Sequence, residues 1–460
     1  MHWRGEGGLR EMLALGFPLV LSEMLEFLMA FCDRWFLSHL GPEYTSASFV
    51  GANTAWTLLA FLFGLCMYIS ALAAQYLGSN QREKAGRTLF QGWWIALFTL
   101  PVCLALIPAG ELLFTHSGHP AEQIPLESTY YSTLMAGGFI VVARVVGASF
   151  LSGIGYTRPV AYASITGLLF NIPANYALIF GNFGFPAMGV RGAALATLMS
   201  ESIILITIAV WLWKFRPANL FTGPRLFKLD PGILKDLWRV GAFNGFDFFL
   251  QMAGFNIFLF LFNIYGLVPA ASLSIVFTWE TLFILPLFAA EIATMSLAGR
   301  YTGQQRPDRV ERTVRSSLQL NLVYTGGLFV LLWVAGPQLA GFFIHSNDTN
   351  PGVLELSVEM MRGLGLYMLA NGISFAFSGG LKGARDTVSP MIISGTCLLL
   401  PAIVCAFLVF LLPGSHLIAW WTYLGINVIK GGIMWWRFKL DRWRDIPPAA
   451  PSPAEPASLT

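Results

Sequence analysis

The residues with the clearest chemical potential are four polar side chains that lie within long apolar runs. Asp33 lies near the end of one such run, and Asn171 and Asn175 lie four residues apart, so they share one face of a helix. Thr197 lies in a further apolar run. Carboxylate, amide and hydroxyl oxygens are ligands for hard cations, and carboxyl groups inside a membrane commonly carry protons. The four side chains are therefore predicted to form a binding site for H⁺ or Na⁺.

Other polar residues in apolar runs also need an explanation, because a charge at the bilayer centre costs about 2.5–3.5 kcal/mol on insertion scales. Six are interpreted as candidates for a substrate or proton path: Glu26, Glu201, Asp247, Gln251, Glu280 and Asn371. Arg144 needs a carboxylate partner, which the sequence does not name, and Glu291 is expected to be solvated near a helix end. For each residue the alternative role is a buried polar contact that only ties helices together.

Twelve apolar segments must position these residues. Hydrophobic residues make up 55% of the 460 and charged residues 12%, and a hydrocarbon layer about 30 Å thick needs roughly 20 apolar residues per helix. The expected segments are 13–40, 49–74, 88–114, 128–152, 159–181, 190–213, 237–264, 270–298, 317–344, 357–381, 388–412 and 416–438. At about 1.5 Å per residue, Asp33, Asn171, Asn175 and Thr197 all lie roughly 9–15 Å below the outer ends of their segments.

Lys and Arg gather in alternate connectors. The connectors that follow segments two, six, eight and ten contain Arg82, Lys84 and Arg87; Arg216, Arg225, Lys228 and Lys235; Arg300, Arg306, Arg309 and Arg312; and Lys382 and Arg385. The opposite connectors contain no Lys or Arg. By the positive-inside rule, the basic connectors and both termini are expected in the cytoplasm of a multi-pass protein of the plasma membrane, the bacterial inner membrane. The net charge of +3 then reflects orientation, and no nucleic-acid partner is expected.

The sequence lacks the motifs of the common enzyme and cofactor classes. The five cysteines lack metal-ligand spacing, and neither a phosphate-binding loop nor a dinucleotide motif is present. A membrane enzyme would need a catalytic group such as His paired with Asp or Ser, and no such pairing is visible. We therefore expect no enzyme activity, no cofactor, and no metal other than Na⁺ at the cation site.

The two halves of the chain resemble each other. The shift that places 9–11 on 234–236 also places 76–78 on 301–303, and a slightly larger shift places 151–157 on 381–387. Six helices per half return the chain to the side where it started, which predicts parallel repeats with a binding cavity between them. The expected fold is an all-α integral membrane protein of 12 transmembrane helices in two six-helix lobes, related by a pseudo-two-fold axis along the membrane normal. The expected parts are an N-lobe (1–213), a cytoplasmic linker (214–236), a C-lobe (237–440) and a disordered tail (441–460).

Several motifs resemble those of the multidrug and toxic compound extrusion (MATE) transporters of the NorM-like branch, over residues 8–440. They are Gly16-Phe17-Pro18, Ala74-Gln75-Tyr76-Leu77-Gly78, Gly153-Ile154-Gly155-Tyr156-Thr157-Arg158-Pro159, Asn171-Ile172-Pro173-Ala174-Asn175-Tyr176, Gly184 to Thr197, and Leu381 to Thr387. The resemblance implies that Asp33, Asn171, Asn175 and Thr197 form the cation site of the N-lobe, and that Pro18 is a hinge.

The C-lobe departs from the family pattern. NorM-like members carry carboxylates where this chain has Gln251 and Asn371. A C-lobe cation site of that kind would require Asp247 or Glu280 to substitute.

The function expected is a monomeric antiporter that exports organic, cationic or amphiphilic small molecules by alternating access, driven by H⁺ or Na⁺. Its partners would be the small-molecule substrate and membrane lipid. The alternative is a flippase for lipid-linked oligosaccharide or polyisoprenoid lipids of the same superfamily, which usually has a basic central cavity. The acidic character of the intramembrane charges favours cationic substrates.

Overall fold

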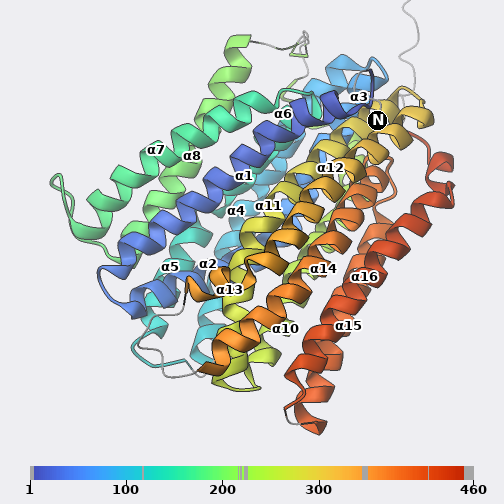
Figure 1. Ribbon diagram of the computed structural model, residues 1–460. Helices are drawn as coiled ribbons and strands as arrows, with labels where there is room; N and C mark the ends of the chain where they lie inside the picture. Colours follow the sequence, from blue (N-terminus) through green and yellow to red (C-terminus); the bar gives the residue numbers. More distant parts are fainter. Residues whose placement is uncertain are drawn as a thin grey trace, which may run out of the picture. The chain divides into compact units, whose positions relative to one another are not determined.

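The computed structural model describes residues 5–116, 119–215, 217, 220–221, 226–343, 351–412 and 414–449. Arg216 and Arg225 of the predicted linker, and the predicted tail beyond residue 449, lie outside these ranges. The described residues form helices joined by short turns, with no strand among them (Figure 1). The predicted all-α class is confirmed.

The helices of the first half follow the six predicted segments closely. They are α1 (Leu9–Ser38), α2 (Pro42–Met67) with α3 (Ile69–Gly78), α4 (Arg82–His116), α5 (Ile124–Ala136) with α6 (Gly138–Gly153), α7 (Thr157–Phe180) and α8 (Val190–Phe215). Helices α5 and α6 form one span that bends by 51°. The bend falls at Gly137, where a Cβ atom would meet Leu198 of α8, so this glycine allows the close packing of the two elements.

The first four spans of the second half begin earlier than predicted, whereas the last two begin at the predicted residues. The helices of this half are α9 (Pro231–Asp236), the π-helical turn η2 (Leu237–Gly241) and α10 (Ala242–Asn263), followed by α11 (Leu267–Gly303), α12 (Pro307–Val334), α13 (Gly336–Gly341), α14 (Pro351–Gly383), α15 (Val388–Leu411) and α16 (His416–Lys439). The side chain of Asp230 accepts hydrogen bonds from the backbone N–H groups of Gly232 and Ile233. This N-cap, with Pro231 at the first helical position, explains why helix starts within the predicted linker.

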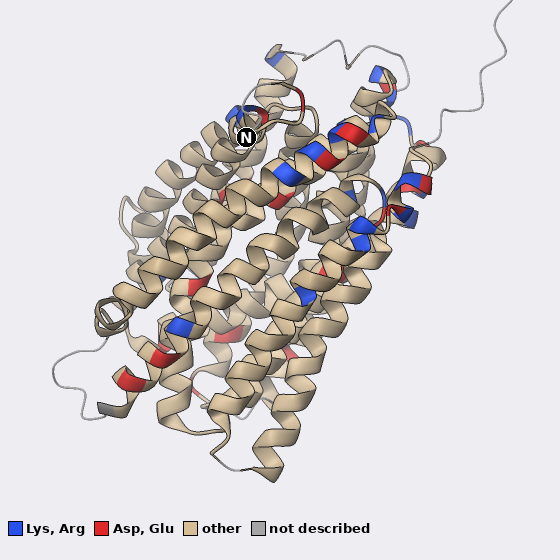
Figure 2. Cartoon of the chain, turned by 45° about the vertical axis from the view of Figure 1, so that its right-hand side comes forward, with Lys and Arg blue, Asp and Glu red and all other residues tan. Residues whose placement is uncertain are grey.

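The described helices account for twelve membrane spans. Ten helical segments are long and apolar enough to cross a membrane, and the bent pair α5 and α6 makes an eleventh. Helix α16 has 24 residues, which is long enough to span the hydrocarbon layer, although polar residues such as Asn427 and Lys430 lower its hydropathy. Figure 2 shows Lys and Arg mostly at helix ends, with a few part of the way along helices.

The predicted disordered tail begins too early. Residues Arg442–Asp445 form a 3-10 turn, η3. Its Trp443 is buried, donates a hydrogen bond to the Phe438 carbonyl at 3.0 Å and stacks on the Phe438 ring at 5.1 Å. This aromatic contact orders the chain beyond α16.

The two halves repeat the same backbone turns. Asn80 and Gln305, which are equivalent positions under the shift that places 76–78 on 301–303, have left-handed φ values of 61° and 57°. In the first turn the Gln81 N–H bonds to the Tyr76 carbonyl at 2.8 Å, and in the second the Arg306 N–H bonds to the Tyr301 carbonyl at 3.0 Å. The internal repeat inferred from the sequence is thus present in the backbone.

The chain divides into two compact units, each with its own core. Unit 1 comprises residues 1–16 and 246–448, and unit 2 comprises residues 17–245 and 449–460. Each unit therefore contains the beginning of the first span of the other half. One boundary falls inside α1, beside Pro18, and the other falls inside α10. The lobe limits expected from the repeat, 1–213 and 237–440, stay a prediction.

Candidate cation site and buried ion pairs

Unit 2 brings together the four side chains predicted to form a cation site. Asp33 of α1, Asn171 and Asn175 of α7 and Thr197 of α8 are all buried. Asn171 Nδ2 and Asn175 Nδ2 donate hydrogen bonds to Asp33 Oδ1 at 3.0 and 2.5 Å, and Thr197 Oγ1 donates to Asp33 Oδ2 at 2.6 Å. The spacing that placed both asparagines on one helix face thus aims both at the same carboxylate oxygen. Their role as cation ligands stays a prediction.

The orientation of the two amide groups defines what this site can do. Three donors surround the Asp33 carboxylate and replace the water that it would have outside the membrane. Asn175 Nδ2 also donates to Asn171 Oδ1 at 2.9 Å, whereas the buried Asn175 Oδ1 accepts no hydrogen bond from any described residue. One amide oxygen beside the carboxylate is therefore available to a cation. A rotation of the Asn171 amide would supply another.

Tyr130 of α5 is a part of this site that the sequence reasoning missed. Its ring is buried in the core of unit 2, and the side chain lies near Thr197 and Asp33. A tyrosine in an apolar segment gives no signal in a single sequence, because its hydroxyl can serve many partners. Only the fold of α5 against α8 places it here.

Arg144 of α6 has two carboxylate partners, which the sequence could not name. Its Nη1 lies 2.7 Å from Glu26 Oε1 of α1, and its Nε lies 2.5 Å from Glu201 Oε2 of α8. The three side chains are 6–23% exposed. In this structure Glu26 and Glu201 are therefore ion-pair partners, and their predicted role in a substrate or proton path remains untested.

One face of α1 carries all of these contacts within unit 2. Ser22 Oγ lies 2.6 Å from Ser164 Oγ of α7, Glu26 pairs with Arg144, and Asp33 bonds to α7 and α8. Positions 22, 26 and 33 lie on nearly the same side of a helix, which has about 3.6 residues per turn. These polar groups attach α1 after Pro18 to α6, α7 and α8, while Phe36 and Leu37 near its end pack in the hydrophobic core of unit 2.

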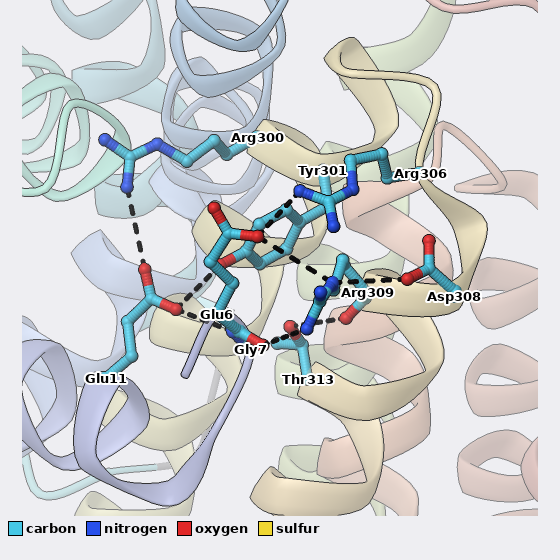
Figure 3. Close-up of polar contacts among 9 residues, drawn as sticks. All are labelled: Glu6, Gly7, Glu11, Arg300, Tyr301, Arg306, Asp308, Arg309 and Thr313. Carbon is cyan, nitrogen blue, oxygen red and sulfur yellow. Dashed lines mark hydrogen bonds and ion pairs between the residues drawn. The ribbon is translucent and has the colours of Figure 1, made fainter. Parts of the chain in front are cut away.

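The beginning of α1 is anchored differently, within unit 1 (Figure 3). Tyr301 donates a hydrogen bond to Glu11 Oε2 at 2.7 Å, and Arg306 Nη1 lies 2.6 Å from Glu6 Oε2. The Gly7 N–H also bonds to Glu11 Oε2 at 2.7 Å. Helix α1 therefore has one polar anchor on each side of Pro18. This placement suits the predicted hinge, since proline removes a backbone hydrogen bond of the helix.

Unit 1 contains an ion-pair cluster that corrects two expectations. Lys382, expected in a cytoplasmic connector, lies in the last turn of α14 and is buried. Its Nζ lies 2.7 Å from Asp247 Oδ2 of α10 and 2.9 Å from Glu291 Oε1 of α11. Glu291, expected to be solvated, is also buried and accepts a hydrogen bond from Ser378 Oγ at 2.6 Å. The sequence placed Lys382 in a loop and Glu291 in solvent, because the position of a charged residue in the sequence does not reveal its ion-pair partner.

The remaining candidates of unit 1 lie around α14. Glu280 of α11 accepts a long hydrogen bond of 3.4 Å from Tyr367 of α14, and Asn371 of α14 accepts one of 3.1 Å from Lys430 of α16. Glu280, Asn371 and Lys430 are buried, whereas Gln251, one turn from Asp247, is partly exposed. Lys430 was not singled out from the sequence.

Ionisable groups inside a bundle of membrane-spanning helices commonly mark the substrate or ion pathways of transport proteins. The MatE family model matches residues 18–177 and 245–408. The chain belongs to this family, whose members are transporters, and the resemblance inferred from the sequence motifs is confirmed.

Relatives named "Probable multidrug resistance protein NorM" align over most of the chain. That of Synechocystis sp. is 27% identical over 93% of each protein, and that of Thermotoga maritima is 27% identical over 84% of this chain and 82% of the relative.

Solved structures of this type share the fold. An outward-facing multidrug resistance MATE transporter of the MOP superfamily superposes with a TM-score of 0.85 at 22% identity, covering 95% of this chain and 97% of that one. A MOP superfamily transporter from Pyrococcus furiosus, described as having a binding pocket of reverse polarity and suggested to differ in function, gives 0.86 at 22% identity, covering 96% and 97%.

Proposed function

We propose that this protein is an antiporter that exports organic cations from the cytoplasm in exchange for H⁺ or Na⁺ bound at Asp33. The observation that carries the proposal is the convergence of Asn171, Asn175 and Thr197 on one buried carboxylate. A contact that only tied helices together would not need an ionisable group. The printed names of the relatives, multidrug resistance proteins, support efflux of organic molecules.

The coupling step follows from charge. A cation at Asp33 neutralises the carboxylate, which weakens the hold of the three donors on α1, because hydrogen bonds to charged groups are about twice as strong as neutral ones. Helix α1 can then bend at Pro18 while its beginning stays anchored through Glu11. Loss of the negative charge also disfavours a bound organic cation, and the protein returns to the inward-facing state to release the coupling ion.

The energetics limit the stoichiometry. Exchange of one proton for one monovalent organic cation moves no net charge, so only the pH difference drives it. One pH unit supplies about 1.4 kcal/mol, which corresponds to roughly tenfold accumulation. Greater accumulation would need a second coupling ion per cycle. We further propose that the protein acts as a monomer in the bacterial inner membrane with both termini in the cytoplasm, as the basic connectors favour.

The test is efflux of a fluorescent organic cation from vesicles under separately imposed proton and sodium gradients. Asp33→Asn should abolish gradient-driven efflux while the protein still folds, because the amide cannot carry the charge that a coupling ion neutralises. Glu83→Gln, an exposed carboxylate in the first turn of α4, is the matched control and should retain efflux. Full gradient-driven transport by the Asp33→Asn protein would refute the proposal.

A flippase for anionic lipid-linked substrates is a second candidate. It is favoured by the buried Lys430 of unit 1, whose Nζ bonds to the neutral Asn371 side chain and which was not part of the sequence argument for cationic substrates. Transfer of a labelled lipid-linked phosphate across liposomes, without export of organic cations, would support this alternative.

A further inference from the structure

Lys430 lies deep within α16, roughly 21 Å from the beginning of the helix and 14 Å from its end, and its side chain is only 4% exposed. A buried ammonium ordinarily pairs with a carboxylate, because an isolated charge in a medium of low dielectric constant is very costly. Lys382 in the same unit does so twice, with Asp247 and Glu291. Lys430 needs a different explanation, because no carboxylate of the described residues lies within ion-pair distance of its Nζ.

The partner of Lys430 is a neutral amide oxygen. Its Nζ donates a hydrogen bond to Asn371 Oδ1 at 3.1 Å. The orientation of Asn371 is fixed, because its Nδ2 donates to the Tyr367 carbonyl one turn earlier in α14 at 3.2 Å. The side chain thus presents its oxygen, the atom that ligates hard cations, to the ammonium.

Glu280 places a carboxyl group on the other side of the same group of residues. It is buried, its Oε1 accepts the hydrogen bond of Tyr367, and Tyr367 OH lies 3.2 Å from Tyr423 OH of α16. The titratable and charged groups that act on Lys430 are Cys397 of α15, Asp247 of α10, and Glu280 and Glu291 of α11. Asp247 and Glu291 are already neutralised in part by Lys382. Glu280 is the carboxylate for which no basic partner lies within ion-pair distance in the described ranges.

We propose that the Lys430 ammonium is a resident cation, which occupies in unit 1 the place that an exchangeable Na⁺ would otherwise take. The ammonium donates a hydrogen bond to the Asn371 oxygen and lies near Glu280. Because it is part of a side chain, it cannot dissociate from the site. Na⁺ would need several free oxygen ligands, but Asn371 Oδ1 already accepts the hydrogen bond of Lys430. Unit 1 therefore contributes no exchangeable coupling ion. If the antiport function proposed above holds, the coupling ion of each transport cycle binds only at Asp33.

The experiment removes Asp33 first, so that only unit 1 is examined. Full-length Asp33→Asn protein and Asp33→Asn/Lys430→Ala protein are unfolded thermally in detergent, in choline, sodium or ethylammonium chloride of equal ionic strength. The Asp33→Asn protein should melt at the same temperature in all three salts. The double variant should melt lower in choline, and saturating Na⁺ or ethylammonium should raise its melting temperature by roughly 2–4 °C, since either ion can fill the space left by Lys430.

Two further variants separate the effect of the charge at position 430 from the effect of the side-chain volume. Asp33→Asn/Lys430→Arg keeps a charge at this position and should not respond to Na⁺. Asp33→Asn/Lys430→Met removes the charge but fills the space, so ethylammonium should not rescue it. A double Lys430→Ala variant indifferent to every cation would overturn the proposal.

A second measurement does not depend on any change at Lys430. Saturable binding of radioactive sodium to the Asp33→Asn protein should be absent. One bound Na⁺ that is lost again in Asp33→Asn/Asn371→Ala would overturn the proposal. Neither measurement uses transport, so failure of the antiport function, seen as efflux by the Asp33→Asn protein, is distinguishable from failure of this inference.

Discussion

Tyr301 donates a hydrogen bond to Glu11, 290 residues earlier, at 2.7 Å, and this contact has a counterpart in the other half of the chain. Tyr76 donates to Asp236 Oδ2 at 3.2 Å. The shift that places Tyr76 on Tyr301 also places Glu11 on Asp236. The beginning of the first span of each half thus belongs to the unit formed mainly by the other half. There it accepts a hydrogen bond from a tyrosine at the end of that other half's second span.

These two clamps should stabilise the protein independently. Tyr301→Phe removes a short hydrogen bond to a partly buried carboxylate and should cost about 1.5–3 kcal/mol of unfolding free energy. Tyr76→Phe removes a longer bond and should cost less. Because the clamps lie in different units, the double variant should show the sum of the two losses in thermal unfolding. Strong non-additivity would indicate that the clamps act as one element.

Pro18 should affect turnover more than ion binding. Pro18→Ala restores a backbone hydrogen bond at the junction of the two anchors of α1 and stiffens the helix there. We expect cation affinity at Asp33 to be retained and the transport rate to fall several-fold. Pro101 in α4, a proline inside a helix with no predicted hinge role, offers the control Pro101→Ala. Equal transport rates for wild type and Pro18→Ala protein would remove the hinge from the mechanism.

Arg144 should be essential for the stability of unit 2. Arg144→Met leaves the carboxylates of Glu26 and Glu201 without their shared cation. Breaking a buried pair by removing one partner typically costs about 3–5 kcal/mol, and the partial exposure of Glu26 places the expected loss at the lower end. Arg144→Met/Glu201→Gln should recover part of this loss in thermal unfolding, since it removes one of the orphaned charges. No recovery would mean that packing, and not charge, is what Arg144 provides.

Thr197 should matter through its hydroxyl group. Thr197→Val keeps the shape of the side chain but removes the hydrogen-bond donor to Asp33 Oδ2 at 2.6 Å. The free energy of unfolding should fall by about 1–3 kcal/mol. Thr197→Ser keeps the donor and serves as the control. Cation affinity, measured by equilibrium binding, should change in the Val variant and remain near wild type in the Ser variant. Identical affinities in both variants would exclude Thr197 from the site.

The spans and the convergence of side chains on Asp33 could be predicted because both depend on linear spacing. Apolar length gives the helices, the interval from 171 to 175 gives a shared face, and the constant rise of a helix along its axis gives a common depth. What spacing does not give is the direction in which a side chain points across the bundle. Lys382, Lys430, Tyr130 and the partners of Arg144 were missed for this reason.

The contacts of Glu11 and Asp236 with tyrosines of the other half of the chain could not be predicted either, because spacing does not reveal the partners of these acidic residues. Glu11 and Asp236 each look like ordinary acidic residues at the first turn of a helix, where a negative charge is favourable in any case. Their partners, Tyr301 and Tyr76, follow apolar segments in a motif that was recognised as a repeat but not as a contact.

Exchange of the coupling ion for the organic substrate at Asp33 can be measured as ion release by the purified protein. Protein loaded with the coupling ion, either radioactive sodium or protons followed with a pH indicator in weak buffer, is mixed with a fluorescent organic cation in excess. We expect the wild type to release one coupling ion per protein and the Asp33→Asn protein to release none. Equal release from both proteins, or binding of the organic cation without release of either ion, would contradict this expectation.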